Sequence, residues 1–87
     1  MKSHAPAEFW RHYEKLPLRV QKLADKCFAF FKRDPLYPSL HLQRIRDEVW
    51  SVRVSDHYRA LAKRREDGWM WFWIGTHEEY NKLIKRI

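Results

Sequence analysis

Cysteine is nearly absent from this chain of 87 residues: Cys27 is the single example, so no disulfide can form within the chain. The five histidines show no recognised ligand spacing, and we therefore predict no metal site and no cofactor. No apolar run reaches the length of about 20 residues that a membrane-spanning helix needs. The first ten residues, MKSHAPAEFW, also lack the apolar core of a secretory signal, so we expect a cytoplasmic protein without membrane contact.

Cys27 lies in the apolar stretch LADKCFAFF, where a cysteine commonly behaves as a small buried hydrophobe. A catalytic cysteine is the alternative, but no neighbouring feature would lower the pKa of its thiol. With neither a disulfide nor a metal, a single domain over residues 1–87 must draw its stability from dense packing. Aromatic residues can supply that packing, because the chain holds five Trp, five Phe and four Tyr.

Positive charge is in excess. Eighteen Lys and Arg against eleven Asp and Glu give a formal net charge of +7. This balance favours an anionic partner such as nucleic acid, or an acidic protein that covers the charge. A basic surface that serves only solubility would give the same composition, so the charge alone does not decide between these interpretations.

Apolar spacing predicts two helices near the N-terminus. The first covers residues 5–17, and Pro17 both ends it and suits the first turn of the second helix, expected over about 18–32. A proline after Asp34 ends the second helix, because the residue before a proline is biased away from helical angles. Residues 40–45 should then form an irregular or extended connector. Its buried residues are predicted to be Leu40, Leu42 and Ile45.

Residues 48–54 and 58–64 alternate polar and apolar side chains, which is typical of two β-strands. If the turn between them is centred on Asp56, Arg53 lies directly opposite Arg59. Like charges that face each other across a strand pair are destabilising, so this pair needs an explanation. The face that must be buried consists of Trp50, Val52, Val54, Tyr58, Ala60 and Ala62.

An Asp-Gly turn signal within residues 66–68 predicts a third antiparallel strand over residues 69–75. Pairing through that turn places Trp71 opposite Arg64. The same register places Trp73 opposite Ala62, where a small side chain leaves room for an indole. The sheet is therefore expected to be a three-stranded meander.

The third strand is apolar on both faces, since Phe72 and Ile74 fall on the side of Leu61. We expect it to be buried on both sides. Its tryptophans could stack on nucleic-acid bases, but core or dimer-interface packing is the stronger interpretation for a strand. Trp69, beside the turn, is the one expected to be most exposed.

The sequence THEE, residues 76–79, fits a capping box in which Thr76 is the N-cap and Glu79 reaches back to it. An apolar stripe follows and predicts a C-terminal helix. The order helix, helix, meander, helix predicts an α+β domain. The stripe consists of Tyr80, Leu83, Ile84 and Ile87.

The solvent side of the first hairpin collects Arg53, Arg59, Lys63 and His57. One interpretation is a solvated face, on which arginine stems cover apolar surface and the charged ends repel only weakly. The other is that the two guanidiniums converge on an anion, most naturally a phosphate, which cancels their repulsion. The residues alone favour neither interpretation.

From about residue 20 to 84 the chain resembles the RelE/ParE superfamily of bacterial type II toxin–antitoxin toxins. Three stretches carry the resemblance: DPLYPSLHLQRI, VWSVRVSDHYRALA and IGTHEEYNKLI. The resemblance implies a small sheet packed against two N-terminal helices, usually preceded by a first strand. Here residues 5–17 read as a helix, so that edge strand is expected to be missing or very short. The resemblance also implies a cognate antitoxin that wraps the basic face or displaces the last helix.

RelE-like members cut messenger RNA in the ribosomal decoding site, and this activity is the function that the resemblance favours. By position, Arg59 matches a functional arginine of these toxins and Arg53 a second basic position. His77 falls where relatives carry a catalytic or phosphate-binding residue, and Tyr80 falls near a tyrosine that some members use. Arg53 and Arg59 would hold the scissile phosphate, His77 would act as general acid or base, and Tyr80 would assist or stack. Lys63 and His57 would add phosphate contacts.

Other interpretations stay open. His77 could be only an exposed residue at the start of a helix, and Tyr80 could serve only the core. ParE-like members poison DNA gyrase without an enzymatic step, and a degenerate member would keep only antitoxin binding. A homodimer is possible, but nothing in the sequence requires one.

Overall fold

The computed structural model describes residues 2–87 and contains both predicted N-terminal helices, the meander and the C-terminal helix. The connector predicted over residues 40–45 begins at the end of a 3₁₀ turn and continues as a strand. In chain order the elements are β1 (Lys2–His4), α1 (Ala7–Glu14), α2 (Leu18–Arg33), η1 (Pro38–Leu40), β2 (Gln43–Arg46), β3 (Val49–Ser55), β4 (Tyr58–Arg65), β5 (Gly68–Thr76) and α3 (His77–Ile84).

Five strands form one sheet in the order β1-β5-β4-β3-β2. The predicted meander β3-β4-β5 occupies the centre, and its antiparallel pairing is confirmed. The three-strand prediction omitted two edge strands: β2 pairs antiparallel with β3, and β1 pairs parallel with β5. The N-terminal strand is therefore present, although it is only three residues long. A strand this short has too few residues to show an alternating pattern.

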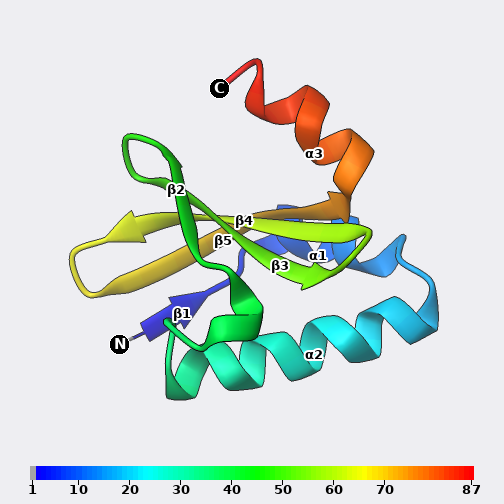
Figure 1. Cartoon of the computed structure of the whole chain (residues 1–87), viewed down its shortest axis with the longest axis horizontal. Helices are drawn as coiled ribbons and strands as arrows, with labels where there is room; N and C mark the ends of the chain where they lie inside the picture. Colours follow the sequence, from blue (N-terminus) through cyan, green and yellow to red (C-terminus); the bar gives the residue numbers. More distant parts are fainter. Residues whose placement is uncertain (1) are drawn as a thin grey trace.

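The sheet separates two layers of helix (Figure 1). The long helix α2 lies across one face, the C-terminal helix α3 stands on the other, and α1 lies against β5. The larger core lies on the α2 side and includes the predicted buried face of β3 and β4. The smaller core lies under α3. Its fully or nearly buried members are Leu61, Trp73 and Tyr80.

Aromatic rings fill the larger core, as the composition predicted. Phe31 of α2 meets Trp69 and Trp71 edge-on, with ring centroids 5.3 and 4.9 Å apart. Trp50 meets Trp69 edge-on at 5.7 Å. Such pairs contribute about 0.5–1.5 kcal/mol each beyond the area that they bury. The prediction that Trp69 is the most exposed tryptophan of the third strand is wrong: it is 6% exposed and Trp73 is 9% exposed, and the rings of Phe31 and Trp50 pack against Trp69.

The register predicted for β5 is also wrong. Arg65 pairs with Gly68, so the turn consists of Glu66 and Asp67, and Arg64 lies opposite Trp69 rather than Trp71. A shift of two residues keeps the side chains of Trp69 to Trp71 on their predicted faces. In the observed register Trp69 pairs with Arg64, and its side chain is buried. Burial of this large apolar side chain favours the observed register over the predicted one.

A β-bulge interrupts β5 in its middle. The pairing shifts between Leu61 and Ala62, where Phe72 is an extra residue. Beyond the bulge the faces exchange: Trp73 packs in the smaller core and Ile74 in the larger one. Both of these faces were predicted the other way round, because alternation assumes an unbroken ladder.

The predicted capping box is confirmed at the start of α3. Oγ1 of Thr76 accepts a hydrogen bond from the Glu79 N–H at 3.1 Å, and the Glu79 carboxylate accepts the Thr76 N–H at 3.0 Å. The bonds fix where β5 ends and α3 begins. Across residues 2–87, the helices all fall short of the length and apolarity needed to cross a membrane.

Candidate functional site

Polar residues form a row across the α3 side of the sheet. Arg53 pairs with Arg59, as predicted, and Arg59 pairs in turn with Gly75. Gly75 has no side chain, and the Trp73 indole occupies the space over it: a Cβ atom there would lie 2.6 Å from the ring. Two residues before Arg53 on the same strand, Ser51 pairs with Gln43 of β2. The strands thus fix the spacing of the charged groups along the row.

A pocket opens on this face between β2, β3, β4 and the start of α3. It brings together all four residues for which the resemblance implied a catalytic role. The other three lining residues come from the connector before β2, from β2 itself and from β3. The lining consists of His41, Gln43, Ser51, Arg53, Arg59, His77 and Tyr80.

The two facing guanidiniums each have a partner within the hairpin. Arg53 forms a salt bridge with Asp56 of the turn. Arg59 donates from Nη1 to the carbonyl oxygens of Ser55 and Tyr58, at 2.6 and 2.9 Å. Burial, followed by the charge of Arg53, lowers the pKa of Arg59. The hairpin therefore offsets the repulsion between the arginines with its own acceptors, an arrangement that neither sequence-based interpretation included.

These bonds engage one terminal nitrogen of each side chain, and a guanidinium carries five N–H donors in a planar fork. Further donors can therefore reach an anion in the pocket without breaking the hairpin contacts of Arg59. Charge-assisted bonds of this kind are about twice as strong as neutral ones. The electrostatics of the pocket suit a phosphate or a carboxylate.

His77 and Tyr80 reach the pocket from α3. The His77 backbone N–H donates to the carbonyl of His57 at 2.7 Å, which holds the start of the helix against the hairpin turn. The ring centroids of His77 and Tyr80 lie 5.8 Å apart. Tyr80 is buried in the smaller core, and its hydroxyl donates to Oγ of Ser51 at 3.3 Å. The Tyr80 ring thus packs, while its hydroxyl faces the pocket.

Two other predicted phosphate contacts lie outside the pocket. Lys63 is four residues from Arg59 along β4, a distance of about 13 Å at 3.3 Å per residue. Its Nζ lies over the Phe72 ring, 5.7 Å from the centroid. His57 is exposed in the turn, and its carbonyl, as described above, is the group that contacts α3. Neither side chain lines the pocket.

Cys27 behaves as a packing residue. Its Sγ donates to the carbonyl of Val54 at 3.3 Å, and burial raises the pKa of its thiol. The residues from 2 to 87 include no group of three or more His, Cys, Asp or Glu placed to hold a metal ion. The charged pocket is a place in the described chain where two arginines, two histidines and a tyrosine meet.

A model of the ParE-like toxin domain matches residues 18–82, which is most of the chain. The chain belongs to the RelE/ParE toxin family. As a type II toxin of this family, it carries the pocket between β2, β3, β4 and the start of α3, and all the residues that line the pocket lie within the matched region. A search of curated proteins found no match.

Solved structures share the fold of this RelE/ParE toxin. The RelB–RelE antitoxin–toxin complex from Methanococcus jannaschii matches with a TM-score of 0.75 at 11% identity, over 92% of this chain and 96% of that one. A YoeB/ParE toxin from Agrobacterium tumefaciens matches with a TM-score of 0.70 at 16% identity, over 88% and 99%. The isolated E. coli RelE toxin matches with a TM-score of 0.64 at 16% identity, over 97% and 95%.

Sequence reasoning missed three residues that line the pocket of this toxin: His41, Gln43 and Ser51. Ser51 is two residues from Arg53 on β3, so strand alternation places both on one face, but the contact of Ser51 with Tyr80 depends on where α3 packs. His41 and Gln43 were assigned to a connector. Had residues 43–46 been read as a strand paired with β3, the antiparallel register would have placed both beside the arginine row.

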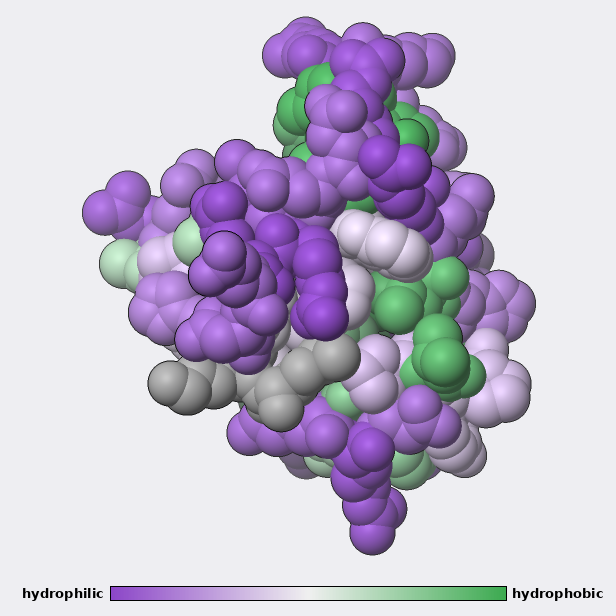
Figure 2. All heavy atoms as spheres, turned by 90° about the vertical axis from the view of Figure 1, so that its left-hand side faces the viewer, coloured by the Kyte–Doolittle hydropathy of each residue, from purple (hydrophilic) through white to green (hydrophobic). Residues whose placement is uncertain are grey.

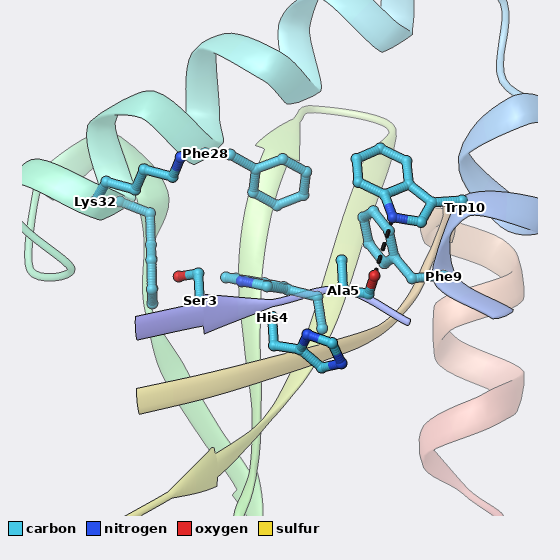
Figure 3. Close-up of a pocket in the computed structure, with 9 residues that line it drawn as sticks. Ser3, His4, Ala5, Phe9, Trp10, Phe28 and Lys32 are labelled. Carbon is cyan, nitrogen blue, oxygen red and sulfur yellow. Dashed lines mark hydrogen bonds between the residues drawn. The ribbon is translucent and has the colours of Figure 1, made fainter. Parts of the chain in front are cut away.

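A second, apolar hollow lies on the other side of the toxin, between β1, α1 and α2 (Figure 3). The rings of Phe9, Trp10 and Phe28 point toward it, and Lys32 stands at its rim. Trp10 donates from its indole N–H to the Ala5 carbonyl at 3.0 Å and is 44% exposed. This hollow has the chemistry to receive an apolar side chain rather than a phosphate.

Proposed function

We propose that this toxin is a ribosome-dependent mRNA endonuclease that stops translation. The observation that carries the proposal is the convergence of Arg53, Arg59, His77 and the Tyr80 hydroxyl on one pocket. Arginine forks suit phosphate, and an imidazole can exchange protons near neutral pH. RNA supplies its own nucleophile, the ribose 2′-hydroxyl, so such a site needs only groups that move protons and stabilise charge.

In the proposed reaction the 2′-oxygen bonds to the adjacent phosphorus while its proton passes to a base. The bond from phosphorus to the 5′-oxygen breaks, and that oxygen takes a proton from an acid. The products are a 2′,3′-cyclic phosphate and a 5′-hydroxyl. Arg53 and Arg59 stabilise the extra negative charge of the five-coordinate phosphorus. His77 provides one of the two proton transfers.

Induced expression with primer extension on cellular messages tests this proposal. We expect the wild type to arrest growth and to leave cuts within translated messages. Arg59→Ala should do neither, because it removes a phosphate contact from the middle of the row. Arg65→Ala is the matched control: it removes an exposed arginine from the far end of β4, where it pairs with Glu48 at 3.6 Å. Growth arrest with intact messages would contradict the nuclease.

Inhibition of DNA gyrase is the second candidate, and the match to a ParE-like domain favours it. In that case the arginine row would be a protein-docking surface, and His77 would be dispensable. A supercoiling assay with purified gyrase separates the two functions. Inhibition by the wild type and by His77→Asn alike, without RNA cleavage, would establish the gyrase interpretation.

We further propose that a cognate antitoxin binds this toxin. The fold is shared with a toxin solved in complex with its antitoxin. The formal charge of +7 suits an acidic partner, and hydrophilic side chains cover most of the end of the molecule that carries the β4–β5 turn (Figure 2). Co-expression with the product of the adjacent gene, followed by affinity capture and growth rescue, tests the pairing. A neighbour that neither binds nor restores growth would contradict it.

A further inference from the structure

His41 shares the charged pocket with His77 and approaches it from the opposite side. Gln43 pairs with Ser51 of β3, and His41 precedes Gln43 by two residues, at the β2 edge of the sheet. At the other end of the row, Arg59 pairs with Gly75, two residues before His77. The strands that carry the two arginines therefore lie between the segments that carry the two histidines, and both histidines line the pocket.

The backbone holds His41 in a defined position. Its N–H donates to the Pro38 carbonyl at 3.3 Å, and the preceding residue, Leu40, is completely buried. The His41 backbone is left-handed, with φ 46° and ψ 50°. Histidine is among the residues enriched in this region, although few side chains other than glycine adopt it. The buried anchor on one side and the β2 ladder on the other limit how far the His41 backbone can move.

The other groups in the pocket leave few candidates for the second proton transfer. The charged and titratable side chains that face His41 are Arg53 of β3, Arg59 of β4, and His77 and Tyr80 of α3. Among residues 2–87, the side chains that line this pocket include no carboxylate. Arginine does not give up its proton in proteins. An imidazole is the side chain best suited to exchange protons near neutral pH.

We infer that His41 is the second proton-transfer group of this site and acts as the partner of His77; the inference rests on the proposed RNA cleavage. In an in-line displacement the attacking and leaving oxygens lie on opposite sides of the phosphorus. Two imidazoles on opposite sides of an arginine-bound phosphate match that requirement. One takes the 2′-proton, the other gives a proton to the 5′-oxygen, and exchange with water restores both.

The test is single-turnover cleavage of a short labelled message on purified ribosomes, measured across the pH range in which imidazole titrates. Wild type should give a bell-shaped profile, because one histidine must be neutral and the other protonated. His41→Asn should cut at least about 100-fold more slowly and lose one limb of the bell. Asparagine tolerates the left-handed backbone, so the fold should be kept. His4→Asn, on β1 and outside the pocket, is the matched control and should behave as wild type.

A second variant separates proton transfer from a structural role. His41→Gly keeps the left-handed backbone, and added imidazole should restore part of its cleavage if the missing group is a proton carrier. Cleavage by His41→Asn at the wild-type rate, or a slower rate with both limbs of the bell retained, overturns the assignment of His41 while leaving the nuclease intact. Failure of the wild type to cut on ribosomes overturns the nuclease and with it this assignment.

Discussion

Arg53 and Arg59 lie directly opposite each other on β3 and β4, and each guanidinium is bound by an acceptor of the same hairpin. Asp56 in the turn partners Arg53, and backbone carbonyls partner Arg59. The two arginines are therefore held ready without a ligand. The two partners differ in charge. The Asp56 carboxylate would compete with a bound phosphate for the Arg53 guanidinium, whereas the carbonyls that contact Arg59 carry no net charge.

This difference predicts that Asp56→Asn binds RNA more tightly than the wild type. The Asp56 side chain is 76% exposed, so its ion pair with Arg53 is worth at most about 1 kcal/mol. The expected gain in affinity for a labelled single-stranded RNA is thus at most about fivefold, measured by fluorescence anisotropy. Asp47→Asn, an exposed acid in the β2–β3 turn, changes the net charge equally and is the control. Equal gains in both variants would show a general charge effect, not release of Arg53.

The facing arginines could be predicted from the sequence because alternation over two strands and one turn fixes a hairpin register. The row beyond them could not. Because of the bulge at Phe72, Trp73 and Ile74 lie on the faces opposite to those predicted. Neither neighbour of Phe72 is a Gly or a Pro, so the sequence contains no signal for this bulge. Alternation predicts a face only as far as the ladder is regular.

His41 shows a second limit of sequence reasoning. The position of His41 depends on β2, which lies at the edge of the sheet. Only Ile45 of this strand is partly buried, so its four residues do not alternate between buried and exposed. The two edge strands pair with residues that the sequence does not mark as partners, β1 most of all, since it joins β5 in parallel from the far end of the chain. Tertiary packing, not local pattern, brings His41 to the site.

Gly75→Ala should destabilise the fold. The added Cβ would lie 2.6 and 2.9 Å from two ring carbons of Trp73 and 3.1 Å from the Glu79 carboxylate. Overpacking of this kind costs about 1–3 kcal/mol in the free energy of unfolding. Urea titration followed by tryptophan fluorescence measures the loss. In the Trp73→Phe background, with a smaller ring, the same substitution should cost less; an equal cost would mean that the ring is not the obstacle.

The capping box predicts a stability change in acid. Hydrogen bonds from the Thr76 backbone and then its side chain lower the pKa of Glu79 in the folded state. A lowered folded pKa contributes stability above the unfolded value of about 4.3, and that contribution is lost as pH falls through the folded pKa. The stability advantage of wild type over Glu79→Gln should therefore shrink from pH 7 into the acid range. Glu78→Gln, without the capping bond, should show no such trend; urea titrations at several pH values measure both.

Variants of Tyr80 and Ser51 can show whether the Tyr80 hydroxyl serves only the packing of the fold or also takes part in cleavage. Tyr80→Phe keeps the buried ring and removes the donor to Ser51, while Ser51→Ala removes the acceptor. Either change should cost about 1 kcal/mol of stability or less, since the bond is long and between neutral groups.

If the hydroxyl acts only in packing, both variants should cut RNA at similar rates. If it contributes to cleavage, Tyr80→Phe should be at least about tenfold slower than Ser51→Ala, because that variant leaves the Tyr80 hydroxyl free to meet the phosphate. Single-turnover cleavage beside thermal unfolding of the same preparations measures the difference.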